Sequence, residues 1–140
     1  MATKDFPELS IDSSIENFSV VKEWLQKIFE EIGCIGKASK QIFIAVDEIY
    51  TNISNYAYED TGKIIINCSY NSDNGLIEIS LSDYGYAYNP LNRPDPDIPQ
   101  RIKEKTVGGL GIFMAKKLMD SVEYSRVDNK NVLVLKKTIN

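Results

Sequence analysis

The chain has 140 residues, of which 43% are hydrophobic and 26% are charged, so it fits one globular domain with a single core. Its formal net charge of −4 argues against a nucleic-acid-binding surface, which is normally basic. No apolar run approaches the roughly 20 residues of a membrane helix, and the N-terminus shows no hydrophobic segment of a signal peptide.

Two residue types restrict the chemistry. Histidine is absent, which excludes a Ser-His-Asp triad, a Cys-His pair, a histidine-ligated zinc and a phosphohistidine intermediate. Cys34 and Cys68 form neither a CxxC motif nor a secreted-type framework, so we expect small core residues in a protein of the reducing cytoplasm. Catalysis would then depend on carboxylates, backbone amides, cations and a bound metal.

The N-terminal half predicts a strand and two helices. Residues 5–11 resemble a short strand, and Ser13 with Glu16 fits a capping box before an amphipathic helix that ends at Gly33. Ser39 is the expected cap of a second helix running to about Tyr58. The apolar face of this second helix would consist of Ile42, Ala45, Val46, Ile49 and Ile53.

The second half switches to a two-residue period. Alternation over residues 64–70 and 77–82, around the turn 71–75, predicts a hairpin with one buried face. A proline-rich stretch then lacks any periodicity. A helix over 111–120 and two strands, 122–127 and 132–137, joined by the turn Asp128-Asn129-Lys130-Asn131, complete the chain. This order predicts an α+β fold, a two-layer α/β sandwich with helices on one face of a mixed, mainly antiparallel sheet.

Three segments carry candidate chemistry. The first is Glu48 and Asn52, four residues apart and therefore on one face of the second helix. Glu48 can act as a base, and the amide oxygen of Asn52 can bind a hard cation such as Mg²⁺. The same spacing is also common on a solvated helix face.

The second segment is Asp83-Tyr84-Gly85, at the end of a strand. A carboxylate there can accept a hydrogen bond from the exocyclic amine of adenine, and a glycine lets the backbone pass close to a flat ring. A strand-terminating turn would have the same sequence.

The third segment, residues 107–112, contains three glycines immediately before a helix. Glycines and the free amides of a helix start can hold phosphates, although a flexible loop is equally consistent with the cluster. Neither the lysine loop of P-loop enzymes nor a Rossmann GxGxxG motif is present.

In this order, Glu48-x-x-x-Asn52, Asp83-x-Gly85 and Gly109-x-Gly111 resemble the N, G1 and G2 boxes of the ATPase superfamily of DNA gyrase, the heat-shock chaperone, histidine kinases and MutL. The small size, the two leading helices and the segment from Gly108 to Asp120 are most similar to its anti-sigma factor serine-kinase branch. The resemblance covers nearly the whole chain and implies one histidine kinase-like ATPase (Bergerat) domain over residues 1–140.

The resemblance also implies residue roles. Asn52 would coordinate the Mg²⁺ that bridges the phosphates of ATP, and Glu48 would be the general base that accepts the proton of a substrate serine. Asp83 would bind the adenine amine beside Gly85. The remaining nucleotide contacts would come from Thr106, Gly108, Gly109, Leu110 and Gly111.

The segment 89–107 would be the ATP lid, and its Arg101, Lys103 and Lys105 are candidate phosphate contacts. Two departures from the family pattern stand out. Ala87 replaces a second glycine of the G1 box, with Tyr88 following it, and related kinases can carry arginine where this chain has Thr106 and Val107.

The expected function is therefore an Mg-ATP-dependent serine kinase that phosphorylates an anti-sigma-antagonist (STAS) protein and otherwise sequesters a sigma factor. By the same resemblance it would be a homodimer that binds neither membrane nor nucleic acid, with the first helix and strand as candidate pairing surfaces. The alternatives are a nucleotide-gated binding module without kinase activity and a detached histidine-kinase catalytic domain.

Overall fold

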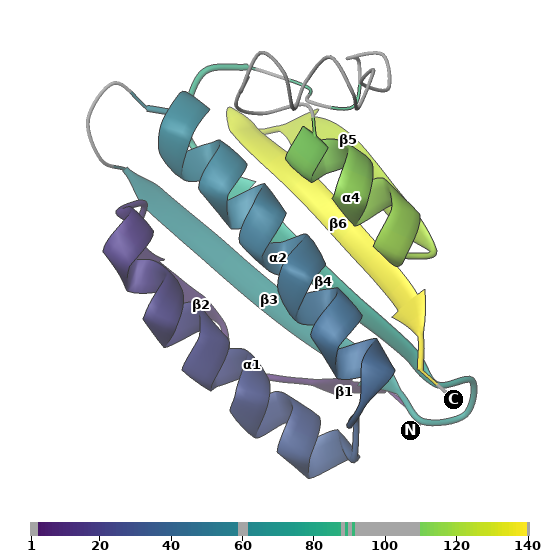
Figure 1. Ribbon diagram of the computed structural model, residues 1–140. Helices are drawn as coiled ribbons and strands as arrows, with labels where there is room; N and C mark the ends of the chain where they lie inside the picture. Colours follow the sequence, from purple (N-terminus) through teal and green to yellow (C-terminus); the bar gives the residue numbers. More distant parts are fainter. Residues whose placement is uncertain (1–2, 59–61, 88, 90, 92–109, 140) are drawn as a thin grey trace.

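The protein is a two-layer structure in which helices cover one face of a single antiparallel sheet (Figure 1). The computed structural model describes residues 3–58, 62–87, 89, 91 and 110–139. The described strands are β1 (Thr3–Asp5), β2 (Leu9–Asp12), β3 (Lys63–Asn71), β4 (Leu76–Asp83), β5 (Ser121–Val127) and β6 (Lys130–Thr138). The described helices are η1 (Ile15–Asn17), α1 (Phe18–Ile32), α2 (Lys37–Tyr56) and α4 (Leu110–Leu118).

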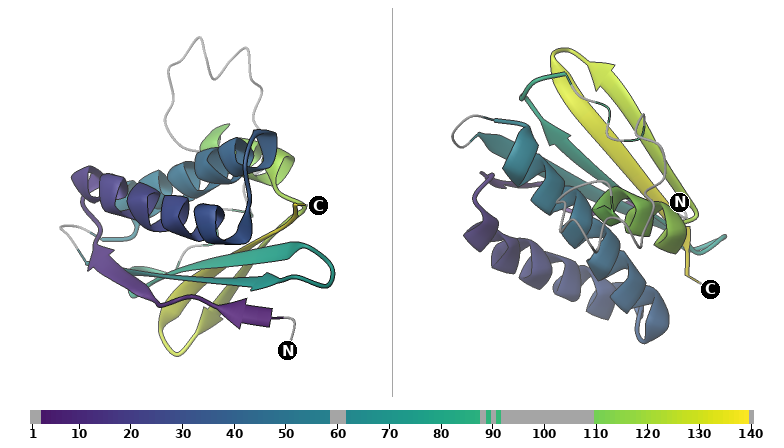
Figure 2. Two further views of the ribbon diagram at one scale, coloured as in Figure 1. Left: turned by 90° about the horizontal axis from the view of Figure 1, so that it is seen from below. Right: turned by 45° about the horizontal axis from the view of Figure 1, so that its top comes forward.

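The sheet has the order β1-β3-β4-β6-β5, and β2 also pairs with β3. Every described strand pair is antiparallel. Helices α1, α2 and α4 lie together on one side, and the view along the sheet shows them as a separate layer (Figure 2). The predicted α+β sandwich is therefore confirmed.

The N-terminal strand is divided in two, where the sequence predicted one strand over residues 5–11. The chain pairs with β3 through β1, leaves it around Pro7, and pairs again through β2. Proline has no backbone N–H to donate to a strand ladder, which accounts for the interruption.

Helix α1 ends as predicted, but its start is organised differently. Gly33 adopts the left-handed conformation with φ 74°, which is the expected end of a helix. The predicted capping box is wrong, because no side-chain cap is present at the start of η1 or of α1. Ser13 instead accepts a hydrogen bond from the backbone amide of Gly62 at 3.1 Å, and Ser14 donates to Glu16.

Helix α2 begins at Lys37, two residues before the predicted cap. Gly36 occupies the cap position with φ 76°, and Ser39 lies inside the first turn, where its hydroxyl donates to the carbonyl of Gly36 at 2.8 Å. Burial of the apolar face of α2 is confirmed, since its five predicted residues are at most 3% exposed. At the other end of the chain, α4 spans Leu110–Leu118 rather than 111–120.

The core lies between the helices and the inward-facing residues of the sheet. Its fully buried side chains include Ile64 and Ile66 on β3, Ile77 on β4 and Leu135 on β6. Both cysteines are free and buried, as predicted. None of the described helices is long and apolar enough to span a bilayer.

The C-terminal hairpin turns over two residues instead of the predicted four. Asp128 and Asn129 both have positive φ, 51° and 64°, which two-residue hairpin turns with mirror-image geometry require and which Asp and Asn tolerate. Strand β6 consequently begins at Lys130, so Asn131 belongs to the strand and not to the turn. This correction moves Asn131 into the sheet, directly opposite Asp83.

Candidate nucleotide site

Helix α2 presents both predicted polar residues at the edge of the core. Asn52 is buried, with 8% of its surface exposed, and Glu48 is half-buried one turn earlier. Burial raises the pKa of the Glu48 carboxyl, and the neighbouring charge of Asp47 raises it further. A carboxyl with a raised pKa is a stronger proton acceptor once ionised, as general-base catalysis requires.

The amide oxygen of Asn52 is buried and has no hydrogen-bond partner in the described part of the chain. Leaving a buried carbonyl oxygen unpaired costs roughly 1–3 kcal/mol, so such groups are uncommon in folded proteins. A hard cation prefers oxygen ligands of this type. Asn52 therefore fits a magnesium ligand, although no cluster of three or more metal-binding side chains occurs among the described residues.

Asp83 ends β4 on the helical side of the sheet and is 3% exposed. Its Oδ1 accepts hydrogen bonds from the backbone amide of Gly85 at 2.9 Å and from Nδ2 of Asn131 at 3.0 Å. Burial raises the pKa of this carboxyl, while Asn131, the Gly85 amide and the nearby Arg126 act in the opposite direction.

The loop after Asp83 passes directly over the end of α2. A Cβ atom on Gly85 would overlap the carbonyl group of Ala57, so glycine is required here by close approach. The same carbonyl oxygen accepts a hydrogen bond from the amide of Tyr86 at 3.0 Å. The role of Gly85 beside a flat ligand stays a prediction; the close approach that the structure shows is to the backbone of Ala57, at the C-cap of α2.

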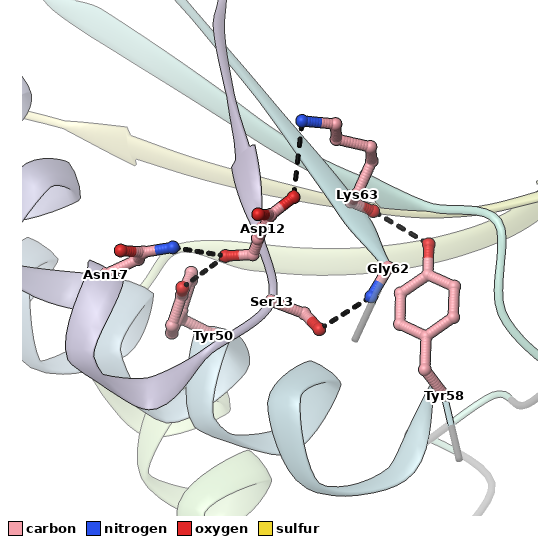
Figure 3. Close-up of polar contacts among 7 residues, drawn as sticks. All are labelled: Asp12, Ser13, Asn17, Tyr50, Tyr58, Gly62 and Lys63. Carbon is pink, nitrogen blue, oxygen red and sulfur yellow. Dashed lines mark hydrogen bonds and ion pairs between the residues drawn. The ribbon is translucent and has the colours of Figure 1, made fainter. Parts of the chain in front are cut away.

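Tyr58 joins this loop to the start of β3, and Figure 3 shows its contact with Lys63. Its hydroxyl donates to the carbonyl of Lys63 at 2.7 Å and accepts from the amide of Tyr84 at 2.7 Å. Beside it, Ser13 bonds to Gly62, which ties the entry to α1 to the same point (Figure 3). The end of α2, the start of β3 and the Asp83 loop are therefore one connected unit.

A cavity of about 360 Å³ lies between this loop, the end of α2 and β5. It is lined by Ala57, Tyr58, Tyr84, Gly85, Tyr86, Ala87 and Arg126. Its aromatic rings and single cation could contact a flat, electron-rich ligand.

The profile of the histidine kinase-like ATPase domain matches residues 11–137 of this chain. The serine-protein kinase RsbW of Staphylococcus aureus is 30% identical to the chain over 124 residues, which cover 85% of this chain and 78% of that protein. This chain belongs to the histidine kinase-like ATPase family. The family predicted from the three sequence motifs is thereby confirmed.

Two solved structures show the same fold. The RsbU and RsbW domains from Mycobacterium tuberculosis match with a TM-score of 0.65 and 20% identity, over 96% of this chain and 33% of that one. A blue-light activated histidine kinase domain from Erythrobacter litoralis matches with a TM-score of 0.52 and 18% identity, over 73% of this chain and 45% of that one. The chain thus spans less than half of either solved chain, and these likenesses concern the fold alone.

The third motif of this histidine kinase-like ATPase domain is described only in part. Leu110 and Gly111 are the first described residues of α4, and their contact with phosphate stays a prediction. The other predicted contacts, Thr106, Gly108 and Gly109, lie outside the described residues, as does most of the predicted lid, including Arg101, Lys103 and Lys105.

Sequence reasoning missed the residues that support Asp83. The sequence pattern predicts that Asn131 lies in a turn, and it assigns no role to Tyr58, Tyr124 or Arg126. The available signal was the Asp-Asn pair, which favours a two-residue turn and would have placed Asn131 in β6. Its inward orientation then follows from alternation with buried Leu133 and Leu135.

Proposed function

We propose that this protein is an Mg-ATP-binding anti-sigma factor with serine kinase activity toward an anti-sigma-antagonist (STAS) protein. The observation that carries the proposal is that Glu48 and Asn52 lie one helical turn apart on α2, while Asp83 lies at the end of β4 on the side of the sheet that the helices cover. Membership of the histidine kinase-like ATPase family and 30% identity to a serine-protein kinase support it.

The proposed roles follow from the chemistry of each group. The carboxylate of Asp83 accepts a hydrogen bond from the adenine amine, and the amide oxygen of Asn52 is a ligand for Mg²⁺, which neutralises phosphate charge when bound. Glu48 accepts the proton of the attacking serine hydroxyl. Phosphoryl transfer depends mainly on positioning and charge neutralisation, so a chain without histidine can perform it.

The partners and setting are part of the same proposal. The protein would alternate between a sigma factor and its antagonist in the cytoplasm, as a homodimer, and would act on transcription without contacting nucleic acid. The formal charge of −4 is consistent with protein partners rather than DNA.

The deciding experiment is incubation of the protein with Mg-ATP and its cognate antagonist. We expect acid-stable phosphoserine on the antagonist, no transfer by Glu48→Ala, and ATP affinity close to wild type in that variant. Glu23→Gln, at an exposed position of α1, is the matched control and should phosphorylate normally. An acid-labile phosphoryl product would indicate histidine-kinase chemistry instead.

A nucleotide-gated binding module is the second candidate, favoured by Thr106 and Val107 at a place where related kinases can carry arginine. In that case ATP would change affinity for a partner without group transfer. Release of a partner by ATP, with no phosphoprotein over a full time course, would support this candidate and contradict the kinase.

A further inference from the structure

The face of the sheet that the helices cover is mainly apolar, but one row of paired residues on it is polar. Asp83 on β4 is opposite Asn131 on β6, and Asn131 is opposite Arg126 on β5. The next inward-facing pair along β4 and β6, Leu81 and Leu133, is buried and apolar. The register of the sheet therefore places a carboxylate, an amide and a guanidinium side by side at the end where the candidate nucleotide site lies.

Asn131 is the central member of this row and is 5% exposed. Its Nδ2 donates to Oδ1 of Asp83 at 3.0 Å and to the carbonyl of Tyr86 at 2.7 Å. A buried amide is costly unless it is hydrogen-bonded, so these contacts account for an Asn in an otherwise apolar strand position.

Tyr124 fixes the orientation of this amide. Its hydroxyl donates to Oδ1 of Asn131 at 2.6 Å. Rotating the amide by 180° would place its oxygen against two other acceptors, the Asp83 carboxylate and the Tyr86 carbonyl. The donor side of Asn131 is therefore committed to Asp83.

The two oxygens of Asp83 are consequently not equivalent. Oδ1 accepts from Asn131 and Gly85, whereas no donor to Oδ2 occurs in the described part of the chain. Loss of the Asn131 hydrogen bond would raise the pKa of Asp83 further, because that bond is the largest of the influences that lower it. Two other titratable or charged groups act near Asp83: Arg126 on β5, which lowers its pKa, and Tyr58, two residues after the end of α2. Tyr124 on β5 contacts Asn131.

We propose that Asn131 is a positioning residue for base recognition: it occupies Oδ1 of Asp83 and so leaves Oδ2 as the oxygen that accepts a hydrogen bond from the exocyclic amine of adenine. The inference rests on the proposed nucleotide function and adds the residue that sets base selectivity. Arg126, which donates to the Gly85 carbonyl at 3.0 Å, and Tyr124 support the same arrangement from β5.

The test compares ATP with purine riboside triphosphate, which lacks only the exocyclic amine, by titration calorimetry in the presence of Mg²⁺. Wild-type protein should prefer ATP by about tenfold or more, as expected for a hydrogen bond to a charged acceptor. Asn131→Asp keeps the shape of the side chain but removes both donated hydrogen bonds. We expect its preference to fall to within about twofold.

Asn67→Asp is the matched control, because it makes the same chemical change on the face of β3 opposite to the helices, between buried Ile66 and Cys68. It should keep the wild-type preference. Tyr124→Phe is the second variant, in case Asn131→Asp does not fold; it removes the hydroxyl that orients Asn131 and should lower the preference in part.

The possible outcomes distinguish a failure of the proposed nucleotide-binding function from a failure of the role given to Asn131. If the wild-type protein binds neither nucleotide, the proposed function is wrong and the inference fails with it. If the wild type prefers ATP and the folded variants keep the full preference, only the role of Asn131 is overturned. A loss of general affinity with an unchanged ratio would indicate a structural role and would also overturn the inference.

Discussion

The hydroxyl of Tyr58 accepts a hydrogen bond from the backbone amide of Tyr84 at 2.7 Å. It simultaneously donates to the carbonyl of Lys63, so one side chain just after α2 holds both the start of β3 and the loop after Asp83. The position of that loop therefore depends on a residue that no nucleotide-binding motif includes.

Tyr58→Phe removes this hydroxyl and leaves the ring in place. We expect the free energy of unfolding to fall by about 1 kcal/mol, the usual net value of a hydrogen bond, and ATP affinity to fall a few-fold because the Asp83 loop is less well fixed. Urea denaturation and calorimetric titration measure the two effects. Tyr70→Phe on β3 is the control; an equal loss of ATP affinity in both variants would contradict the role given to Tyr58.

Gly85→Ala places a methyl group against the carbonyl of Ala57. We expect a loss of about 1–3 kcal/mol in stability from overpacking and a displaced Asp83 loop that binds ATP weakly. Gly33→Ala provides the comparison, since Gly33 has φ 74° but open space around its Cβ position. It should cost about 1 kcal/mol through backbone strain and leave ATP affinity unchanged.

Asp83→Asn should affect the stability of the fold and the affinity for ATP in different ways. Burial raises the pKa of Asp83 above its unfolded value of 3.8, so the folded state binds this proton more tightly than the unfolded state. The resulting stabilisation is complete below the unfolded pKa and is lost as pH rises through the folded pKa. The stability of Asp83→Asn relative to wild type should therefore increase from pH 4 to pH 7, in urea melts at several pH values, while ATP affinity falls at least about tenfold. A relative stability that decreases over this range would contradict the raised pKa.

Asn52→Ala tests the unpaired amide oxygen of α2. We expect ATP to bind the variant with almost the same affinity with and without Mg²⁺, whereas the wild type should bind much more tightly with the metal. Calorimetric titrations in magnesium and in a chelator give both values. Asn55→Ala, at an exposed position of the same helix, should keep the metal dependence.

Asp47→Asn should change the pH dependence of phosphoryl transfer. The charge of Asp47 is the second cause, after burial, of the raised pKa of Glu48, and a general base must be ionised to act. Rates should therefore decline at a lower pH in the variant than in the wild type, with an unchanged plateau above it. An acidic limb at the same pH in both proteins would indicate that Glu48 is not the titrating base.

Much of the fold could be predicted because the relevant signals are local. Apolar spacing located α1 and the buried face of α2, and two-residue alternation located β3 and β4. Errors occurred where tertiary contacts decided the outcome. Ser13 bonds to Gly62, 49 residues away, rather than capping a helix, and Pro7 divides the first strand.

In the candidate site, too, local sequence signals identify some residues, and only tertiary contacts reveal the others. Glu48, Asn52 and Asp83 could be predicted as site residues because their spacing and position in the elements are visible in one segment at a time. Asn131 and Tyr124 act only through strand register, which brings β6 and β5 beside β4. No single segment of sequence contains that information.

The two-residue turn of Asp128 and Asn129 limits which insertions the chain can accept between β5 and β6. Surface turns usually tolerate insertions, because few contacts depend on their length. Here one additional residue that shifted β5 against β6 would turn Tyr124 and Arg126 to the opposite face of the sheet, away from Asn131. The length of an exposed turn should therefore be as restricted among functional variants as the residues of the site itself.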